Sequence, residues 1–156
     1  MNKKKLTAWL VLGTLAALVE GLILQSLHAA SPSLLVPVLL YIASKNTNAS
    51  LILALWLGFL LDVIAVAPFG VFMFISVGML TLAQSLNDRG IEFIYLPTLL
   101  LASAILLGWQ YAVLAVVGVL SGSYSIEMFG YLGFIYGLQV LLTTVLGFVL
   151  LRLVRV

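Results

Sequence analysis

Six apolar stretches, separated by short turn-forming breaks, make up most of this chain of 156 residues. A helix of about 20 apolar residues crosses the hydrocarbon core of a bilayer. Only 8% of the residues are charged and 64% are hydrophobic, which leaves too little charge to cover the surface of a soluble domain. The sequence therefore predicts an all-α, polytopic membrane bundle of six transmembrane helices, in a single integral membrane domain over residues 1–156. The estimated stretches are Leu6–Leu27, Ser33–Ser44, Ala49–Ala67, Gly70–Leu86, Phe93–Leu120 and Met128–Leu153.

The start of the chain imitates a secretory signal peptide, with basic residues ahead of an apolar core and Ala-Ala-Ser behind it. That core runs for about 20 residues, which is longer than the apolar region of most signal peptides. We therefore expect the first stretch to be retained as a membrane helix.

The positions of the basic residues test the number of spans. With six crossings, the N-terminus, the second and fourth connections and the C-terminus share one side of the membrane. That side receives every Lys and Arg of the chain: Lys3, Lys4, Lys5, Lys45, Arg89, Arg152 and Arg155. Because basic residues favour the cytoplasmic side, both termini are predicted to be cytoplasmic. The second stretch then has to cross the membrane or dip deeply into it.

The second stretch, SPSLLVPVLLYIAS, is too short to span a bilayer upright and contains Pro32 and Pro37. A proline inside a helix removes a backbone hydrogen-bond donor and clashes with the preceding turn. Backbone groups freed at membrane depth have to be satisfied by protein or by a cavity. We therefore expect a helix that is bent at Pro37 and held among the others.

Small residues mark two helix faces on which backbones can approach closely. Gly13, Ala17 and Gly21 recur at every fourth position of the first stretch, and Gly133 and Gly137 have the same spacing in the last. In lipid, helices associate largely by van der Waals packing, which such faces favour. Both faces are therefore predicted to be packed, so that leucine in place of Ala17 or Gly137 displaces a neighbouring helix.

Two carboxylates fall within apolar stretches. Asp62 lies about 8 Å and Glu20 about 10 Å inside the outer ends of their helices, with Gln110 about 15 Å deep in the fifth stretch. Ionisable residues in membrane spans usually face protein or water and find a partner there. Three alternatives stay open for Asp62. These are a wet outer vestibule with hydrogen bonds to helix ends, a structural role in the turn at 68–70, and a substrate or ion site.

The sequence offers little for catalysis, a cofactor or nucleic acid. It has no cysteine and one histidine, which argues against thiolate or clustered metal sites. No serine has the histidine and aspartate that would activate it as a nucleophile. The basic residues lie at segment ends and do not gather on one face. We therefore expect a protein that is not an enzyme and that has no cofactor, no metal site and no nucleic-acid partner.

The stretch GFLLDVIAVAPFG contains the most informative motif, in which Gly58 and Asp62 precede Pro68-Phe69-Gly70. This arrangement on the third span, ahead of another apolar helix, resembles the rod shape-determining protein MreD family. The opening of the second stretch at Pro32 is similar to the Pro-Asp-Leu opening of that family, with Ser33 in place of the acidic residue. The chain length, six spans and cytoplasmic termini agree with the family over nearly the whole chain.

The resemblance implies a non-enzymatic scaffold of the cell-elongation machinery in the bacterial inner membrane, which supports peptidoglycan synthesis and rod shape. The implied partners are a bitopic MreC-type protein and, through it, the elongation transpeptidase, RodA and MreB. Such a scaffold needs an exposed apolar groove for a partner helix.

The resemblance also implies a fold similar to the S components of energy-coupling-factor transporters, which supplies an alternative function as a vitamin-binding subunit. An S component needs a loop that closes over its substrate, and the outer connections here are short. A proton-coupled exporter is a third alternative, and it would depend on Asp62.

Overall fold

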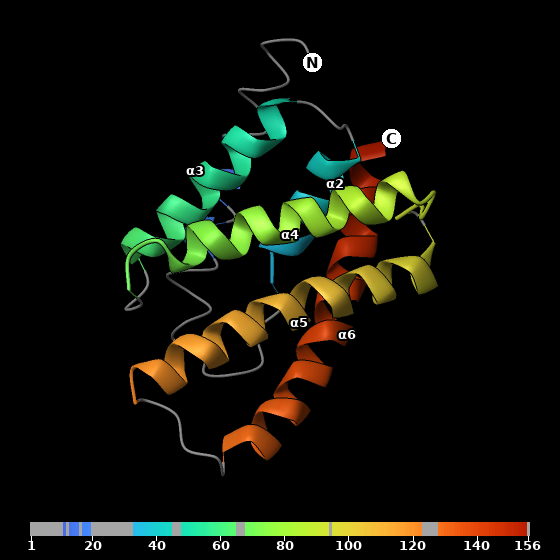
Figure 1. The fold of residues 1–156 in the computed structure, drawn as a ribbon. Helices are drawn as coiled ribbons and strands as arrows, with labels where there is room; N and C mark the ends of the chain where they lie inside the picture. The colour runs from blue at the N-terminus through green and yellow to red at the C-terminus, as the bar shows by residue number, and fades with distance from the viewer. Residues whose placement is uncertain are drawn as a thin grey trace.

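The computed structural model is all-helical in the part of the chain that it describes (Figure 1). That part comprises residues 11, 13–15, 17–19, 33–44, 48–64, 68–93, 95–122 and 128–155, and no strand occurs in it. The helices are α2 (Leu35–Ala43), α3 (Asn48–Ile64), α4 (Val71–Asp88), α5 (Leu96–Leu120) and α6 (Met128–Arg155). The described residues between 11 and 19 are helical as well. The all-α prediction is confirmed, and the helix bounds lie within a few residues of the expected ones.

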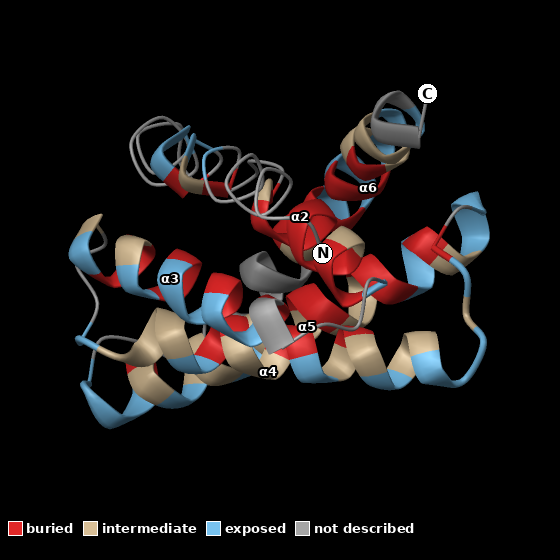
Figure 2. Cartoon of the chain, turned by 90° about the horizontal axis from the view of Figure 1, so that it is seen from above, coloured by how far each residue is buried: buried red, intermediate tan, exposed pale blue. Residues whose placement is uncertain are grey.

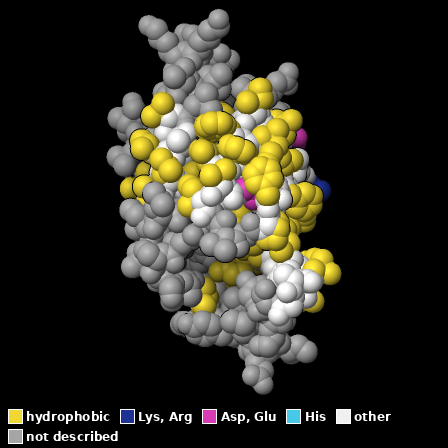
Figure 3. Space-filling model, turned by 90° about the vertical axis from the view of Figure 1, so that its left-hand side faces the viewer, with side chains coloured by type: hydrophobic (Ala, Val, Ile, Leu, Met, Phe, Trp, Pro, Cys, Tyr) yellow, Lys and Arg dark blue, Asp and Glu magenta, His cyan; other side chains and the backbone are white. Residues whose placement is uncertain are grey.

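Three helical segments are long and apolar enough to cross a membrane: Val71–Asp88, Leu96–Leu120 and Ile135–Arg152. The apolar part of α3 is shorter and covers Ser50–Ile64. Hydrophobic side chains dominate the described surface on the side where α3 meets α4 (Figure 3). Such a surface is stable against lipid, whereas in water it would favour aggregation. The chain is therefore a membrane protein built as a helical bundle.

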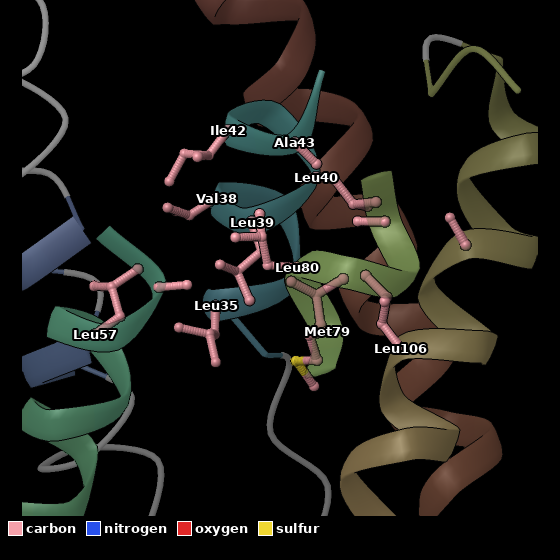
Figure 4. Close-up of a cluster of buried hydrophobic side chains, with 14 of the residues drawn as sticks. Leu35, Val38, Leu39, Leu40, Ile42, Ala43, Leu57, Met79, Leu80 and Leu106 are labelled. Atoms are coloured by element: carbon pink, nitrogen blue, oxygen red, sulfur yellow. The ribbon is translucent and has the colours of Figure 1, made fainter. Parts of the chain in front are cut away.

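The short helix α2 lies at the centre of the bundle, in contact with α3, α4, α5 and α6 (Figure 2). All of its nine residues except Tyr41 are buried. A helix that is hydrophobic on every side has to be enclosed, and the four longer helices enclose this one. Leu39 and Leu40 lie in the same apolar cluster as Met79 and Leu80 of α4 (Figure 4).

Pro37 lies in the first turn of α2, which begins at Leu35. The backbone N–H groups of a first turn have no partner within the helix, so a proline there removes no helical hydrogen bond. The expectation that Pro37 bends this helix was therefore wrong. Its ring packs against α6, where a Cβ atom built on Gly147 would lie 3.3 Å from Pro37 Cγ. Just before α2, the Ser33 N–H donates to Thr143 Oγ1 of α6 at 2.9 Å.

The connection from α4 to α5 begins with a left-handed glycine. Gly90 has a φ of 77°, and its N–H donates to the Asn87 carbonyl at 2.9 Å. The Ile91 N–H donates to the Leu86 carbonyl at 3.1 Å. These two bonds form a Schellman motif, which satisfies carbonyls that the end of the helix leaves free. The chain therefore turns back sharply into α5.

The two small-residue faces differ in the structure. A Cβ atom built on Gly13 would lie 3.0 Å from Leu57 Cδ2 of α3, and Ala17 is buried. Gly137 is exposed, and a Cβ atom there would meet nothing within 4 Å. The prediction that Gly137 packs against a neighbour was therefore wrong. The close approach of α6 to its neighbours occurs at Gly147, which faces α2 and α5.

Leucine at Gly147 should destabilise the bundle, because the new side chain would collide with Pro37 and push α2 away from α6. We expect Gly147→Leu to lower the free energy of unfolding by about 1–3 kcal/mol, measured by equilibrium unfolding in detergent micelles. The matched control is Gly137→Leu on the same helix, which should leave stability nearly unchanged. Equal losses in the two variants would contradict this packing.

Candidate functional site

The carboxylate of Asp62 caps the N-terminus of the next helix. Its Oδ1 atom accepts a hydrogen bond from the Phe72 N–H at 2.8 Å, and its Oδ2 atom accepts one from the Met73 N–H at 3.1 Å. The N-cap residue of α4 is Gly70, which has no side chain for this role. Asp62 therefore supplies from α3 the acceptors that an N-cap side chain usually supplies locally. The positive end of the α4 dipole also favours a carboxylate at this place.

Gly58 allows the two helices to come close enough for this contact. A Cβ atom built on Gly58 would lie 2.5 Å from Met73 Cα and 2.7 Å from the Phe72 carbonyl oxygen. No side chain fits in that space, so the first turn of α4 lies directly on the α3 backbone. Because Gly58 precedes Asp62 by four residues, both lie on the same face of α3. One residue provides the space and the other provides the hydrogen-bond acceptors.

The Pro68-Phe69-Gly70 turn completes this junction. Gly70 has a φ of 96°, a conformation that L-residues other than glycine rarely adopt. The Val71 N–H donates to the Pro68 carbonyl at 3.3 Å. The Phe69 ring lies edge-on to the Phe59 ring of α3, with 6.0 Å between the ring centroids. We call Gly58, Asp62, the turn at 68–70 and the first turn of α4 the α3–α4 junction.

The α3–α4 junction leaves Asp62 little capacity for chemistry. Its side chain is buried, with 5% of its surface exposed, and both of its oxygens already accept backbone hydrogen bonds. The geometry shows the hydrogen bonds to a helix end that the first alternative named, in a buried structural role at the helix start just after the turn at 68–70. Within the described residues, no three His, Asp or Glu side chains gather as a metal site would need.

Several residues singled out in the sequence are not placed by the structure. Glu20, Gly21 and Pro32 lie outside the described residues. Gly133 lies in α6, but its surroundings are outside the described part. Gln110 lies in α5, and its Oε1 atom is buried without a hydrogen-bond partner. The hydrogen bonds of Asp62 come from Phe72 and Met73, so Gln110 is not one of its partners.

An apolar groove of about 610 Å³ lies between the beginning of α4 and the second half of α5. Its walls are hydrophobic, and they start at the α3–α4 junction. The Trp109 ring lies beside Phe74, with 5.5 Å between the ring centroids. The residues that line the groove include Phe69, Val71, Phe74, Trp109, Val113 and Val116. The groove can hold an apolar side chain or helix face, but it offers no charged group to a polar ligand.

Sequence reasoning missed the polar contacts that join α5 to α6. The Tyr111 hydroxyl donates to Gln139 Oε1 at 2.7 Å, and the Tyr136 hydroxyl donates to the Ala104 carbonyl at 2.6 Å. The two tyrosine rings lie edge to face, with centroids 5.6 Å apart. The available signal was the presence of Gln139 and two tyrosines within apolar helices. Their partners depend on how the helices pack, which the sequence did not reveal.

With this geometry established, the chain can be compared with known proteins. No family model, curated protein or solved structure matches it.

Replacing Asp62 should loosen the start of α4. Asp62→Leu removes both acceptors and leaves two N–H groups without partners, so we expect a loss of about 1–3 kcal/mol in the free energy of unfolding. Asp62→Asn keeps one acceptor oxygen and should lose less. Amide hydrogen exchange at Phe72 and Met73 should become faster in both variants. Unchanged exchange in Asp62→Leu would contradict the capping role, and Asp88→Asn is a control.

Alanine in place of either of two junction glycines should destabilise the protein, for a different reason at each position. Gly58→Ala places a methyl group against the α4 backbone and should cost about 1–3 kcal/mol by overpacking. Gly70→Ala has free space around the new methyl group but should cost about 1–2 kcal/mol because of its positive φ. Spin labels at Ile52 and Thr81 should show a larger spacing of α3 and α4 only in Gly58→Ala. Equal spacing in the two variants would contradict the close approach.

Proposed function

We propose that this protein is a non-enzymatic membrane scaffold of the bacterial cell-elongation machinery, of the MreD type. The observation that carries this proposal is the α3–α4 junction. Gly58, Asp62 and the turn at 68–70 are the residues on which the family resemblance rests, and they act together on one contact. A junction that fixes the relative position of two membrane helices suits a protein that holds an assembly together.

The groove between α4 and α5 supports the scaffold function. A scaffold that binds a single-span protein needs an apolar surface into which a helix can pack, and this groove is apolar and open along the bundle. Aromatic side chains such as Phe74 and Trp109 line it, and aromatic residues often contribute most to binding energy. We propose an MreC-type bitopic protein as the occupant. The elongation transpeptidase, RodA and MreB would be reached through that partner.

The proposed topology has six crossings with both termini in the cytoplasm of a bacterial inner membrane. The distribution of basic residues supports it, since Arg89 follows α4 and Arg152 lies near the end of α6. In this topology the second crossing contains α2 and the residues on either side of it. At about 1.5 Å per residue α2 reaches across about half of the hydrocarbon core. The residues on either side of α2 would cover the other half, and the longer helices around it would cross the full thickness of the membrane.

Filling the groove should weaken the partner complex without unfolding the scaffold. We expect Val116→Trp to reduce co-purification with a reconstituted MreC-type partner by roughly tenfold, because the indole would occupy the space of a partner side chain. The matched control is Val145→Trp on α6, where the original side chain is equally exposed. The bilayer has to be kept, so the complex is best measured in nanodiscs.

Two outcomes would overturn the proposed function. One is the absence of any stable complex between the intact chain and a single-span partner of this type. The other is tight binding of a vitamin to the purified chain, which would favour the S-component alternative. Equal retention of the partner by Val116→Trp and by wild type would remove the groove as its binding surface.

A further inference from the structure

Helix α5 carries polar atoms that the bundle leaves without partners. Among the described residues, the buried side-chain oxygen and nitrogen atoms that lack a hydrogen bond are Ser103 Oγ, Trp109 Nε1 and Gln110 Oε1. All three belong to α5. Buried polar groups are almost always hydrogen-bonded, and those that are not need a specific explanation. Of these three atoms, Trp109 Nε1 lies beside α4, next to Gly78.

The contacts of α5 with its two neighbours differ in kind. On the α6 side, hydrogen bonds from Tyr111 and Tyr136 fix the pair. On the α4 side, the Trp109 ring lies against Gly78, where a Cβ atom would be only 2.3 Å from Nε1. This contact is steric, since the indole N–H has no acceptor. The α5–α6 pair is therefore joined internally by directional bonds and meets α4 at Trp109 by packing alone.

The groove beside this close contact leaves room for α5 to move. The groove of about 610 Å³ separates α4 from α5 on the side of Trp109 that leads to the end of α5. Figure 1 shows the two helices close together near their connection and farther apart toward the other end. Because Gly78 has no side chain, the indole lies directly on the α4 backbone, where a helix carbonyl can accept a second hydrogen bond. A small shift of α5 along α4 could therefore bring an acceptor to the Trp109 N–H.

We propose that the α5–α6 pair occupies two positions relative to the α3–α4 pair. The first is the arrangement described above, with an open groove and unpartnered polar atoms on α5. In the second, α5 has moved along α4, the groove is narrower, and the Trp109 N–H donates to a carbonyl of α4. The α3–α4 junction holds one pair together, and hydrogen bonds between α5 and α6 hold the other. In the proposed motion α2 moves with α6, to which Ser33 and Pro37 join it, and the two units shear past each other.

Distances between spin labels test this motion directly. The chain has no cysteine, so labels attach only at introduced positions. Val63→Cys with Val119→Cys reports the spacing of the two pairs, since both positions are exposed and Val119 lies outside the groove lining. Double electron–electron resonance in nanodiscs should give two distances for these labels. The control pairs Val63→Cys with Ser85→Cys, and Val119→Cys with Val149→Cys, lie within one unit and should each give a single distance.

Removing the indole donor should shift the balance between the positions. Trp109→Phe removes the N–H group that gains an acceptor only in the second position. The second position then loses its stabilising hydrogen bond, so the share of the second distance should fall roughly tenfold. Trp56→Phe is the matched control. Its indole N–H already donates to Thr14 Oγ1 at 3.2 Å, and its loss should leave the distribution unchanged. One narrow distance between the two units, or a second distance that Trp109→Phe leaves unaltered, would overturn the proposal.

Discussion

The contact between the Asp62 carboxylate and the first turn of α4 is the constraint on which the rest of the bundle depends. It joins the end of one helix to the beginning of the next through both carboxylate oxygens. Gly58 brings the two backbones together, so the contact also sets how closely α3 and α4 approach. Their spacing in turn positions Met79 and Leu80 against α2. A buried carboxylate that would be costly alone is stabilised here because helix N–H groups solvate it.

The bundle surrounds a short central helix, so the helices that face lipid and the helix that fills the interior are different ones. The longer helices face lipid with exposed apolar side chains, whereas α2 contributes only to the interior. Lipid provides no hydrophobic force to hold helices together, so close packing and hydrogen bonds have to do so. Both occur where the start of α2 meets α6. Pro37 packs closely against Gly147, and Ser33 is hydrogen-bonded to Thr143. The proposed scaffold would present a firmly held α3–α4 pair beside an adaptable groove.

Much of the candidate site could be read from the sequence, and the part that could not has a clear physical reason. The spacing of Gly58 and Asp62 and the turn at 68–70 identified the residues of the junction. The α5–α6 contacts and the orphaned Trp109 N–H were not foreseen, because apolar helices carry no marker of which neighbour each face meets. Gly137 shows the same limit: a small residue permits close packing, but it does not require a partner.

The sequence by itself determined the helices, their approximate ends and the membrane environment, because apolar length and turn residues are local properties that a bilayer constrains strongly. The tertiary structure decided which polar groups are hydrogen-bonded and to which partners. Only the approach of α4 to Gly58 turns Asp62 from a stranded charge into a helix cap. Only the position of α2 turns Pro37 from a potential helix breaker into a packing surface. These outcomes depend on contacts between separate helices, and the sequence of one helix alone does not specify them.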